Sequence, residues 1–170
     1  MLLGFFIIFE KNILAILYNI KKCKNYILHK NSICKKELWS MKVNDVFEDF
    51  NVGSLSLPKG KVEFSALQWH QHPTFAGVEL KHLIMAQDTE GKFSYHLVKI
   101  APNKKIGLHI HENQLETHEV IAGSGICFND GVEIEYKPGV ISIFPASVQH
   151  EIMADAEGLF LFAKFFPALC

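Results

Sequence analysis

The sequence predicts an all-β domain built as a sandwich or barrel, and two observations carry this prediction. From Gly53 onward, short β-prone runs alternate with turn signals, among them "LPKG" at 57–60, "DTEG" at 88–91 and "KPG" at 137–139. No interval of about 10–15 residues has the periodicity of an amphipathic helix, which argues against a parallel α/β fold.

The expected strands follow one another between these turns. In "FNDGVEIEY" at 128–136, an Asp-Gly step separates two β-prone runs, which is a strong hairpin signal. Val132, Ile134 and Tyr136 alternate with glutamates, so one face of this strand is expected to be dry and the other wet. The full set of expected strands is 77–85, 92–100, 106–111, 118–123, 125–128, 132–136, 140–144, 150–154 and 158–166.

The last expected strand, "GLFLFAKFF" at 158–166, is apolar on both faces and is interrupted only by Lys164. In so small a domain, such a strand is expected to be covered on both sides. Packing inside the chain is the simpler explanation. Cover by a partner subunit is the alternative, and on this ground the sequence predicts a homodimer.

Charged residues are unevenly distributed along the chain. Residues 41–170 carry ten lysines against sixteen acidic side chains, and the chain contains no arginine. Phosphate contacts to nucleic acids come mostly from clustered Lys and Arg, so the sequence predicts no nucleic-acid binding. A phosphate or carboxylate of a substrate would also lack the bidentate fork that a guanidinium offers.

The first 40 residues differ from the rest, because Phe, Ile, Leu, Asn, Tyr and Lys make up 29 of them. Glu10, Lys11 and Asn12 interrupt the apolar run, which is shorter on either side than the roughly 20 residues of a membrane-spanning helix. A signal-peptide cleavage pattern is also lacking. Residues 1–40 are therefore interpreted as an extension outside a folded domain at 41–170, with Met41 as a natural start. A membrane-proximal leader is the competing explanation, although membrane insertion is not expected.

The four cysteines, Cys23, Cys34, Cys127 and Cys170, form no CxxC pair and have no metal-finger spacing. A reduced cytoplasmic protein with incidental thiols is the simplest interpretation. Cys127 falls inside an expected strand, where a buried small side chain is expected rather than a nucleophile.

The stretch "GLHIHENQLETHEVIAG" at 107–123 concentrates side chains that bind metals. Side chains at positions i and i+2 of a strand face the same way, so His109 and His111 project together. The polar loop that follows is long enough to reverse the chain and bring Glu116 opposite the two imidazoles. Two His and one carboxylate leave open positions on a metal, and His150 is the candidate for a further ligand.

These residues resemble the two sequence motifs of the cupin family, G-x5-H-x-H-x(3,4)-E-x6-G and G-x5-P-x-G-x2-H-x3-N. The resemblance extends over roughly residues 75–166. The matching residues, at the spacings of the motifs, are His109, His111, Glu116 and Gly123 in the first and Gly139, Pro145 and His150 in the second.

Three positions depart from the motifs. Asn103 and Ser147 stand where the motifs have glycine, and Ala154 stands where the second motif ends in Asn. Asn is the best non-glycine residue for a left-handed turn, so the first change is mild. None of the three departures removes a ligand.

The resemblance implies a cupin-type double-stranded β-helix, or jelly-roll barrel, with a three-His, one-Glu metal site in its mouth. The ligands would be His109, His111, Glu116 and His150. Three nitrogens and one oxygen suit one divalent transition metal ion (Fe, Mn, Ni, Zn or Cu) and disfavour Ca or Mg. The imidazoles must be neutral to bind, which sets a lower pH limit on metal binding.

Other histidines are candidates to contact the ligands or to line the barrel. His118 shares a face with Glu116 and is such a candidate, with a hydrogen-bonded core position as the alternative. His96 and His82 lie on expected strands, where each either lines the cavity or is a satisfied core group.

A second His-x-His pair, His70 and His72 in "WHQHPTF", lies beside a proline and has no acidic residue at a matching distance. It is interpreted as structural or exposed.

Fold alone does not determine function, and this fold hosts many chemistries. The first hypothesis is a metal-dependent enzyme of dioxygenase or isomerase type that acts on a small organic molecule. The alternative is a non-catalytic, metal-containing ligand-binding or sensor protein, and a structural cupin with an empty site is the third. The missing arginine favours a small neutral or aromatic substrate over a phosphosugar. The sequence assigns no catalytic residue and no organic cofactor.

Overall fold

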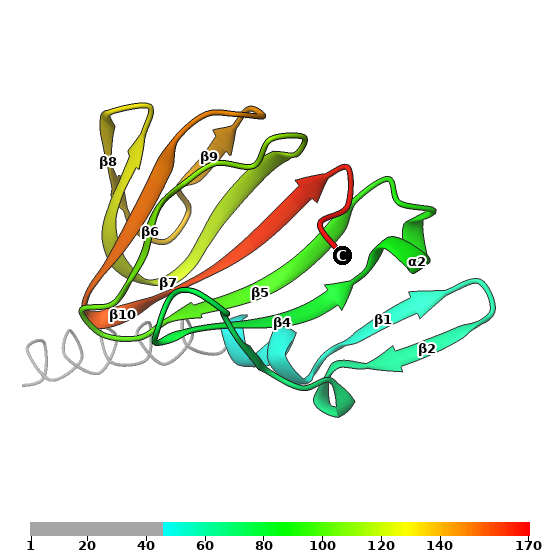
Figure 1. The fold of residues 1–170 in the computed structure, drawn as a ribbon. Helices are drawn as coiled ribbons and strands as arrows, with labels where there is room; N and C mark the ends of the chain where they lie inside the picture. Colours follow the sequence, from blue (N-terminus) through cyan, green and yellow to red (C-terminus); the bar gives the residue numbers. More distant parts are fainter. Residues whose placement is uncertain (1–45) are drawn as a thin grey trace, which may run out of the picture. The chain divides into compact units, whose positions relative to one another are not determined.

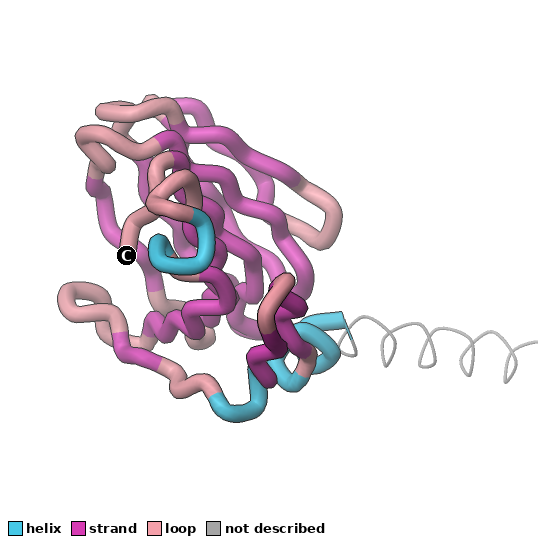
Figure 2. Tube along the Cα trace, turned by 90° about the vertical axis from the view of Figure 1, so that its right-hand side faces the viewer, coloured by secondary structure: helices cyan, strands magenta, loops and turns pink. Residues whose placement is uncertain are grey.

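The computed structural model describes residues 46–170, and the predicted extension at 1–40 lies outside the described residues. The boundary between that extension and the domain at 41–170 therefore stays a prediction. Within the described part, strands dominate (Figure 1), and the helices are short (Figure 2). The helical segments are residues 46–52, η1 (Phe64–Ala66) and α2 (Ala86–Thr89). The all-β prediction is confirmed.

Two long strands run through both layers of the barrel. β7 (Leu115–Asn129) and β10 (His150–Phe166) pair antiparallel, and their register shifts near the middle of both strands. Because of these shifts, the two halves of each strand belong to different sheet layers. One layer contains the first half of β7 with the second half of β10, and the other contains the remaining halves.

The larger layer surrounds the first half of β7 and the second half of β10, and all its strand pairs are antiparallel. The strands that join them are β3 (His70–Gln71), β4 (Val78–Ile84), β5 (Ser94–Ile100) and β9 (Ile141–Phe144). On one side β5 pairs with β10, β4 pairs with β5, and β3 pairs with β4. On the other side β9 pairs with β7.

The smaller layer is completed by one strand on each side of the β7–β10 pair. β6 (Lys105–His109) pairs with β10, and β8 (Val132–Tyr136) pairs with β7 across the predicted Asp-Gly hairpin. A separate hairpin of β1 (Ser54–Leu57) and β2 (Gly60–Glu63) lies outside both layers (Figure 1).

Glycines permit the transition between the layers. Gly123 has φ +76, and a Cβ atom on it would lie 2.1 Å from the carbonyl oxygen of Gly158. A Cβ atom on Gly125 would lie 2.2 Å from the carbonyl oxygen of Met153. The two long strands therefore approach each other more closely than any side chain allows.

The two positions that replace motif glycines keep a glycine-like backbone. Asn103 has φ 58 and Ser147 has φ 66, both in the left-handed region. The turn expected at Asn103 is therefore present. Ser147 adopts the same conformation at a higher steric cost, because its side chain is less suited to that region than Asn.

The second half of β10 is buried on both faces, as the apolar sequence predicts. On the inner face, Leu159, Leu161 and Phe165 join the barrel core. On the outer face, Phe162 packs in a second cluster with Phe47 and other apolar residues. Phe47 belongs to the helical segment 46–52, so the chain itself supplies this cover. Packing inside the chain thus explains the two apolar faces, and the homodimer stays a prediction.

A buried ammonium group joins this outer cover to the sheet. Lys81 of β4 is 3% exposed, and its Nζ donates to the Asn51 carbonyl (2.9 Å), the Asn51 Oδ1 (2.6 Å) and the Phe64 carbonyl (3.1 Å). Three acceptors satisfy the three protons of the ammonium, so the charge is buried without an unpaired donor.

No helix among residues 46–170 is both long and apolar enough to span a membrane.

The steric constraint at Gly123 predicts that Gly123→Ala is strongly destabilising. Gly131 is the matched control, because its φ of +79 is close to that of Gly123 but a Cβ there meets no atom within 4 Å. We expect Gly131→Ala to cost about 1–2 kcal/mol for its backbone conformation, and Gly123→Ala more than about 3 kcal/mol because a clash is added. Urea unfolding followed by circular dichroism measures both. Equal losses would show that the close approach to Gly158 is unimportant.

Candidate metal centre

The four residues predicted as metal ligands converge at one end of the barrel. His109 ends β6, His111 lies two residues beyond it, Glu116 is the second residue of β7, and His150 begins β10. One ligand atom from each of the four lies within 4.8 Å of the others. The structure thus brings together all four residues that the motif resemblance implied.

Strand pairing places these side chains on both layers. His150 and His109 are direct partners in the β10–β6 pair of the smaller layer. Glu116 lies opposite Phe165 in the β7–β10 pair of the larger layer. The cluster therefore spans the two layers where they meet, and its geometry depends on the bend of the long strands.

Backbone carbonyls orient two of the imidazoles. His109 Nδ1 lies 2.8 Å from the Gly107 carbonyl, and His150 Nδ1 lies 3.1 Å from the Val148 carbonyl. A carbonyl only accepts, so each Nδ1 carries the donated proton. In the neutral rings Nε2 then holds the lone pair, which is the tautomer that a ligand histidine requires.

Glu116 is the centre of the cluster and is only 4% exposed. Its Oε2 lies 3.1 Å from His111 Nε2 and 3.0 Å from His150 Nε2. Burial alone would raise the pKa of this carboxyl, but in the metal-free protein the electrostatic contacts with His118, His111 and His150 hold it well below its usual range. Glu116 is therefore ionised, as metal ligation requires.

His118 positions the carboxylate from the other side. Its Nε2 donates to Glu116 Oε1 over 2.8 Å, and its Nδ1 lies 3.2 Å from the Tyr136 hydroxyl. His118 and Tyr136 are both buried. This arrangement agrees with the expectation that His118 contacts a ligand. Tyr136 was not among the expected site residues, because strand alternation indicated only that it lies on the dry face of its strand.

The atoms that face one another in the cluster show whether the four residues fit a metal ion. With Nδ1 of His150 donating to a carbonyl, a neutral ring directs the Nε2 lone pair at the Glu116 carboxylate, 3.0 Å away. Two acceptors at that distance repel unless a positive ion lies between them, either a proton or a metal. Burial and the neighbouring His150 lower the pKa of His109, which keeps that ring neutral. The residues present therefore fit a divalent transition metal ion.

A small, mostly apolar cavity of about 70 Å³ adjoins the cluster. His109, His111, Glu116 and His118 contribute its polar wall. The apolar wall includes Leu80, Val98, Ile106, Leu161, Phe165 and Leu169. Apolar walls lower the local dielectric around whatever binds there.

His72 lies closer to this site than the sequence analysis expected. It is partly buried and lines the same cavity. Its Nδ1 accepts hydrogen bonds from the backbone N–H groups of Thr74 (3.1 Å) and Phe75 (3.2 Å), so the structural role expected for it is also present. Burial and the nearby His111 lower its pKa. No local sequence pattern signals this position, because His72 reaches the cavity through chain packing rather than motif spacing.

His96 lies beyond Phe165 and faces His82. The two Nδ1 atoms are 2.8 Å apart, and the His96 ring packs 5.5 Å from the Phe165 ring. Phe165 also packs 5.0 Å from His111, so this ring lies between His96 and the first cluster. His70, from the other His-x-His pair, is exposed and stacks on His82 at 5.0 Å.

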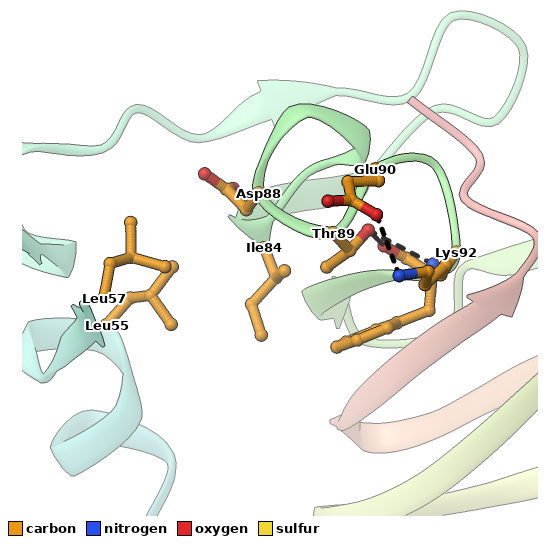
Figure 3. A pocket seen from close by; sticks show the side chains of 8 residues that line it. Leu55, Leu57, Ile84, Asp88, Thr89, Glu90 and Lys92 are labelled. Carbon is orange, nitrogen blue, oxygen red and sulfur yellow. Dashed lines mark hydrogen bonds and ion pairs between the residues drawn. The ribbon is translucent and has the colours of Figure 1, made fainter. Parts of the chain in front are cut away.

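A larger hollow of about 370 Å³ lies between the β1–β2 hairpin and the α2 region (Figure 3). Leu55 and Leu57 lie on one side, Glu90 and Lys92 lie on the other, and Ile84 lies between them. Those two charges are exposed and paired with each other at 2.9 Å. Ionisable groups that are buried and converge are found instead at the smaller cavity.

Cys127 is fully buried next to Tyr136, and burial raises the pKa of its thiol to about 11. A protonated, buried thiol is a poor nucleophile. The expectation that this cysteine is a small core side chain is confirmed.

A family model described as "Cupin domain" matches residues 96–162. The oxalate-binding protein of Thermotoga maritima is 26% identical over 76 residues, which are 44% of this chain and 63% of that protein. The match thus spans less than two thirds of the relative's length.

Three solved structures share the architecture. A predicted oxalate decarboxylase from Thermotoga maritima has a TM-score of 0.54 at 22% identity, covering 61% of this chain and 95% of that one. The polyketide cyclase RemF from Streptomyces resistomycificus has a TM-score of 0.55 at 20% identity, covering 64% and 78%. KdgF from Halomonas sp. has a TM-score of 0.53 at 18% identity, covering 59% and 86%. At these identities the likeness shows the fold.

The buried histidines predict how the stability of the metal-free protein depends on pH. Burial and the neighbouring His82 lower the pKa of His96 from 6.5 to about 4. Between these values the unfolded chain binds a proton that the folded protein does not, so stability is present at high pH and is lost as the pH falls from 6.5 to 4.

His96→Gln removes this group. We expect its stability to fall less steeply over the same interval, by up to about 1.4 kcal/mol per pH unit for one proton. Urea unfolding of chelator-treated protein at several pH values gives the slope of the unfolding free energy against pH for the wild type and for the variant. The difference in unfolding free energy between the two proteins at pH 8 separately reports the packing that is lost. Parallel slopes would contradict the assignment to His96.

Proposed function

We propose that this chain, a small cupin, binds one divalent transition metal ion through His109, His111, Glu116 and His150 and is a metal-dependent enzyme acting on a small organic molecule. The family match and the jelly-roll architecture confirm the resemblance of the motifs. One observation supports the function above all: four metal-compatible side chains converge within 4.8 Å beside a mostly apolar cavity. Building such a cluster is costly for a fold unless a cation neutralises it.

The chain's own residues would divide the work as follows. The three imidazoles and Glu116 hold the ion, and His118 with Tyr136 keeps the carboxylate in place. His72 uses Nδ1 as an acceptor for two backbone N–H groups, so its Nε2 carries the proton and is the donor that remains for a bound molecule. The metal, when bound, would supply Lewis-acid or redox chemistry of dioxygenase or isomerase type.

The cavity beside the cluster is small, at about 70 Å³, and most of its wall is apolar. We therefore expect a small organic molecule to bind there, neutral or aromatic as the sequence indicated.

The curated relative is named an oxalate-binding protein, and a similar structure from the same organism is named a predicted oxalate decarboxylase. A two-carbon dicarboxylate is a small organic molecule of the expected kind. The cavity offers it no guanidinium, so its charge would have to be met by the metal and by His72. We include it as the first molecule to test within the class of small organic acids and neutral analogues.

The alternative is a cupin that holds a metal and binds a ligand without turnover. The name of the oxalate-binding relative and the small, apolar cavity favour it over a purely structural role. In that case the metal site persists, but no substrate is consumed.

We predict that His111→Ala and His150→Ala each lower the metal content of purified protein by about one equivalent, because each removes one of four ligands. His70→Ala is the matched control, since His70 is exposed and outside the cluster. Elemental analysis by mass spectrometry measures the content. Unchanged metal in both cluster variants would overturn the site.

Oxygen uptake and substrate loss separate the two functions. For the enzyme, we expect metal-loaded protein to consume oxalate or another small organic molecule, and His150→Ala to lose more than about 100-fold of that rate. Calorimetric binding of such molecules with no consumption across the panel would instead support the ligand-binding protein. Protein that retains its metal but neither binds nor consumes any of them would contradict both.

A further inference from the structure

We propose a second metal site, formed by His82, His96 and Cys170, which takes a thiophilic divalent ion of the Zn²⁺ type. Its ligand atoms would be Nδ1 of each histidine and the Cys170 thiolate. These three residues share no member with the first cluster, so the inference does not depend on the proposed function.

The three ligand atoms already lie together. His82 Nδ1 and His96 Nδ1 are 2.8 Å apart, Cys170 Sγ is 3.8 Å from His82 Nδ1, and all three atoms lie within 4.8 Å of one another. Ligand atoms on a tetrahedral zinc ion with bonds of about 2.0–2.3 Å are separated by roughly 3.3–3.6 Å. Both observed separations reach that range through shifts of less than about 1 Å.

Three different segments supply the ligands, which makes the cluster a tertiary feature. His82 is on β4 and His96 is its direct partner on β5. Cys170 comes from the C-terminal segment that folds back toward α2 (Figure 1), where its carbonyl accepts from the Ala86 N–H at 2.6 Å. His96 is buried, His82 is partly buried and Cys170 is exposed. An ion can therefore enter from the cysteine side and still be held by a buried ligand.

Ser94 can accept the Nε2 proton in the tautomer of His96 that a metal requires. Its Oγ accepts from the Leu169 N–H at 2.9 Å and lies 2.8 Å from His96 Nε2. When His96 donates its Nε2 proton to this oxygen, the Nδ1 lone pair faces His82 and the site. A ligand histidine commonly has such a partner on its other nitrogen.

Metal binding at this site displaces protons in a defined way. Without metal, the 2.8 Å contact requires a proton on one of the two Nδ1 atoms. On binding, the ring that carries this proton changes to its Nε2–H tautomer, and the Cys170 thiol releases its proton to solvent. Burial raises the pKa of that thiol, so the metal must compete with the proton and binding should strengthen as the pH rises.

The site would also hold the chain beside the first cavity. Leu169, the residue before Cys170, lines that cavity, and Phe165 packs against both His96 and His111. An ion on Cys170 would therefore hold in place the neighbouring Leu169, which lines the first cavity.

Cobalt(II) distinguishes the two sites, because a thiolate ligand produces a charge-transfer absorption band in the near ultraviolet and the first cluster has no sulfur. We expect metal-free, reduced full-length protein to develop this band on titration with Co²⁺. Cys170→Ser should abolish it, and His82→Gln should weaken Co²⁺ binding at this site more than about tenfold. Cys170 is exposed, so its substitution leaves the core intact.

His150→Ala serves as the reciprocal control. It removes a ligand of the first cluster and should retain the charge-transfer band, so failure of one site is distinguishable from failure of the other. The second site is overturned if wild-type protein develops no such band. It is equally overturned if the band persists in Cys170→Ser, because another cysteine is then the ligand, or if His82→Gln binds Co²⁺ like the wild type.

Discussion

A buried carboxylate is the constraint on which the rest of this structure depends. Glu116 is ionised, nearly inaccessible to water and contacted by Nε2 atoms of His111, His118 and His150. A charge removed from water in this way must be compensated locally or the fold loses several kcal/mol. Much of the surrounding architecture serves to place the compensating groups around Glu116.

The bend of β7 and β10 is the first feature that brings these groups to Glu116. Because the long strands pass from one layer to the other, Glu116 on the larger layer faces His109 and His150 on the smaller one. The bend needs a backbone approach that only glycine permits, as at Gly123 beside Gly158. The steric requirement at Gly123 is therefore part of what positions the two strands that carry Glu116 and His150.

Polar groups on the inner face fall into two clusters separated by Phe165. One contains the three-His, one-Glu set, and the other contains His82, His96 and Cys170. The ring contacts His111 on one side and His96 on the other, so the clusters remain distinct although they lie close together. The C-terminal segment connects them, because Leu169 lines the first cavity and Cys170 belongs to the second cluster.

The sequence by itself determined the all-β class and the convergence of His109, His111, Glu116 and His150, because strand periodicity and motif spacing are local properties that survive folding. It also indicated the left-handed turn at Asn103. Only the tertiary structure decided that His72 lines the cavity, that residues 46–52 cover the outer face of β10, and that Cys170 lies beside His82, 88 positions away. The physical reason is that such contacts depend on strand register and on how segments pack, and no local spacing encodes the distance between residues on separate strands.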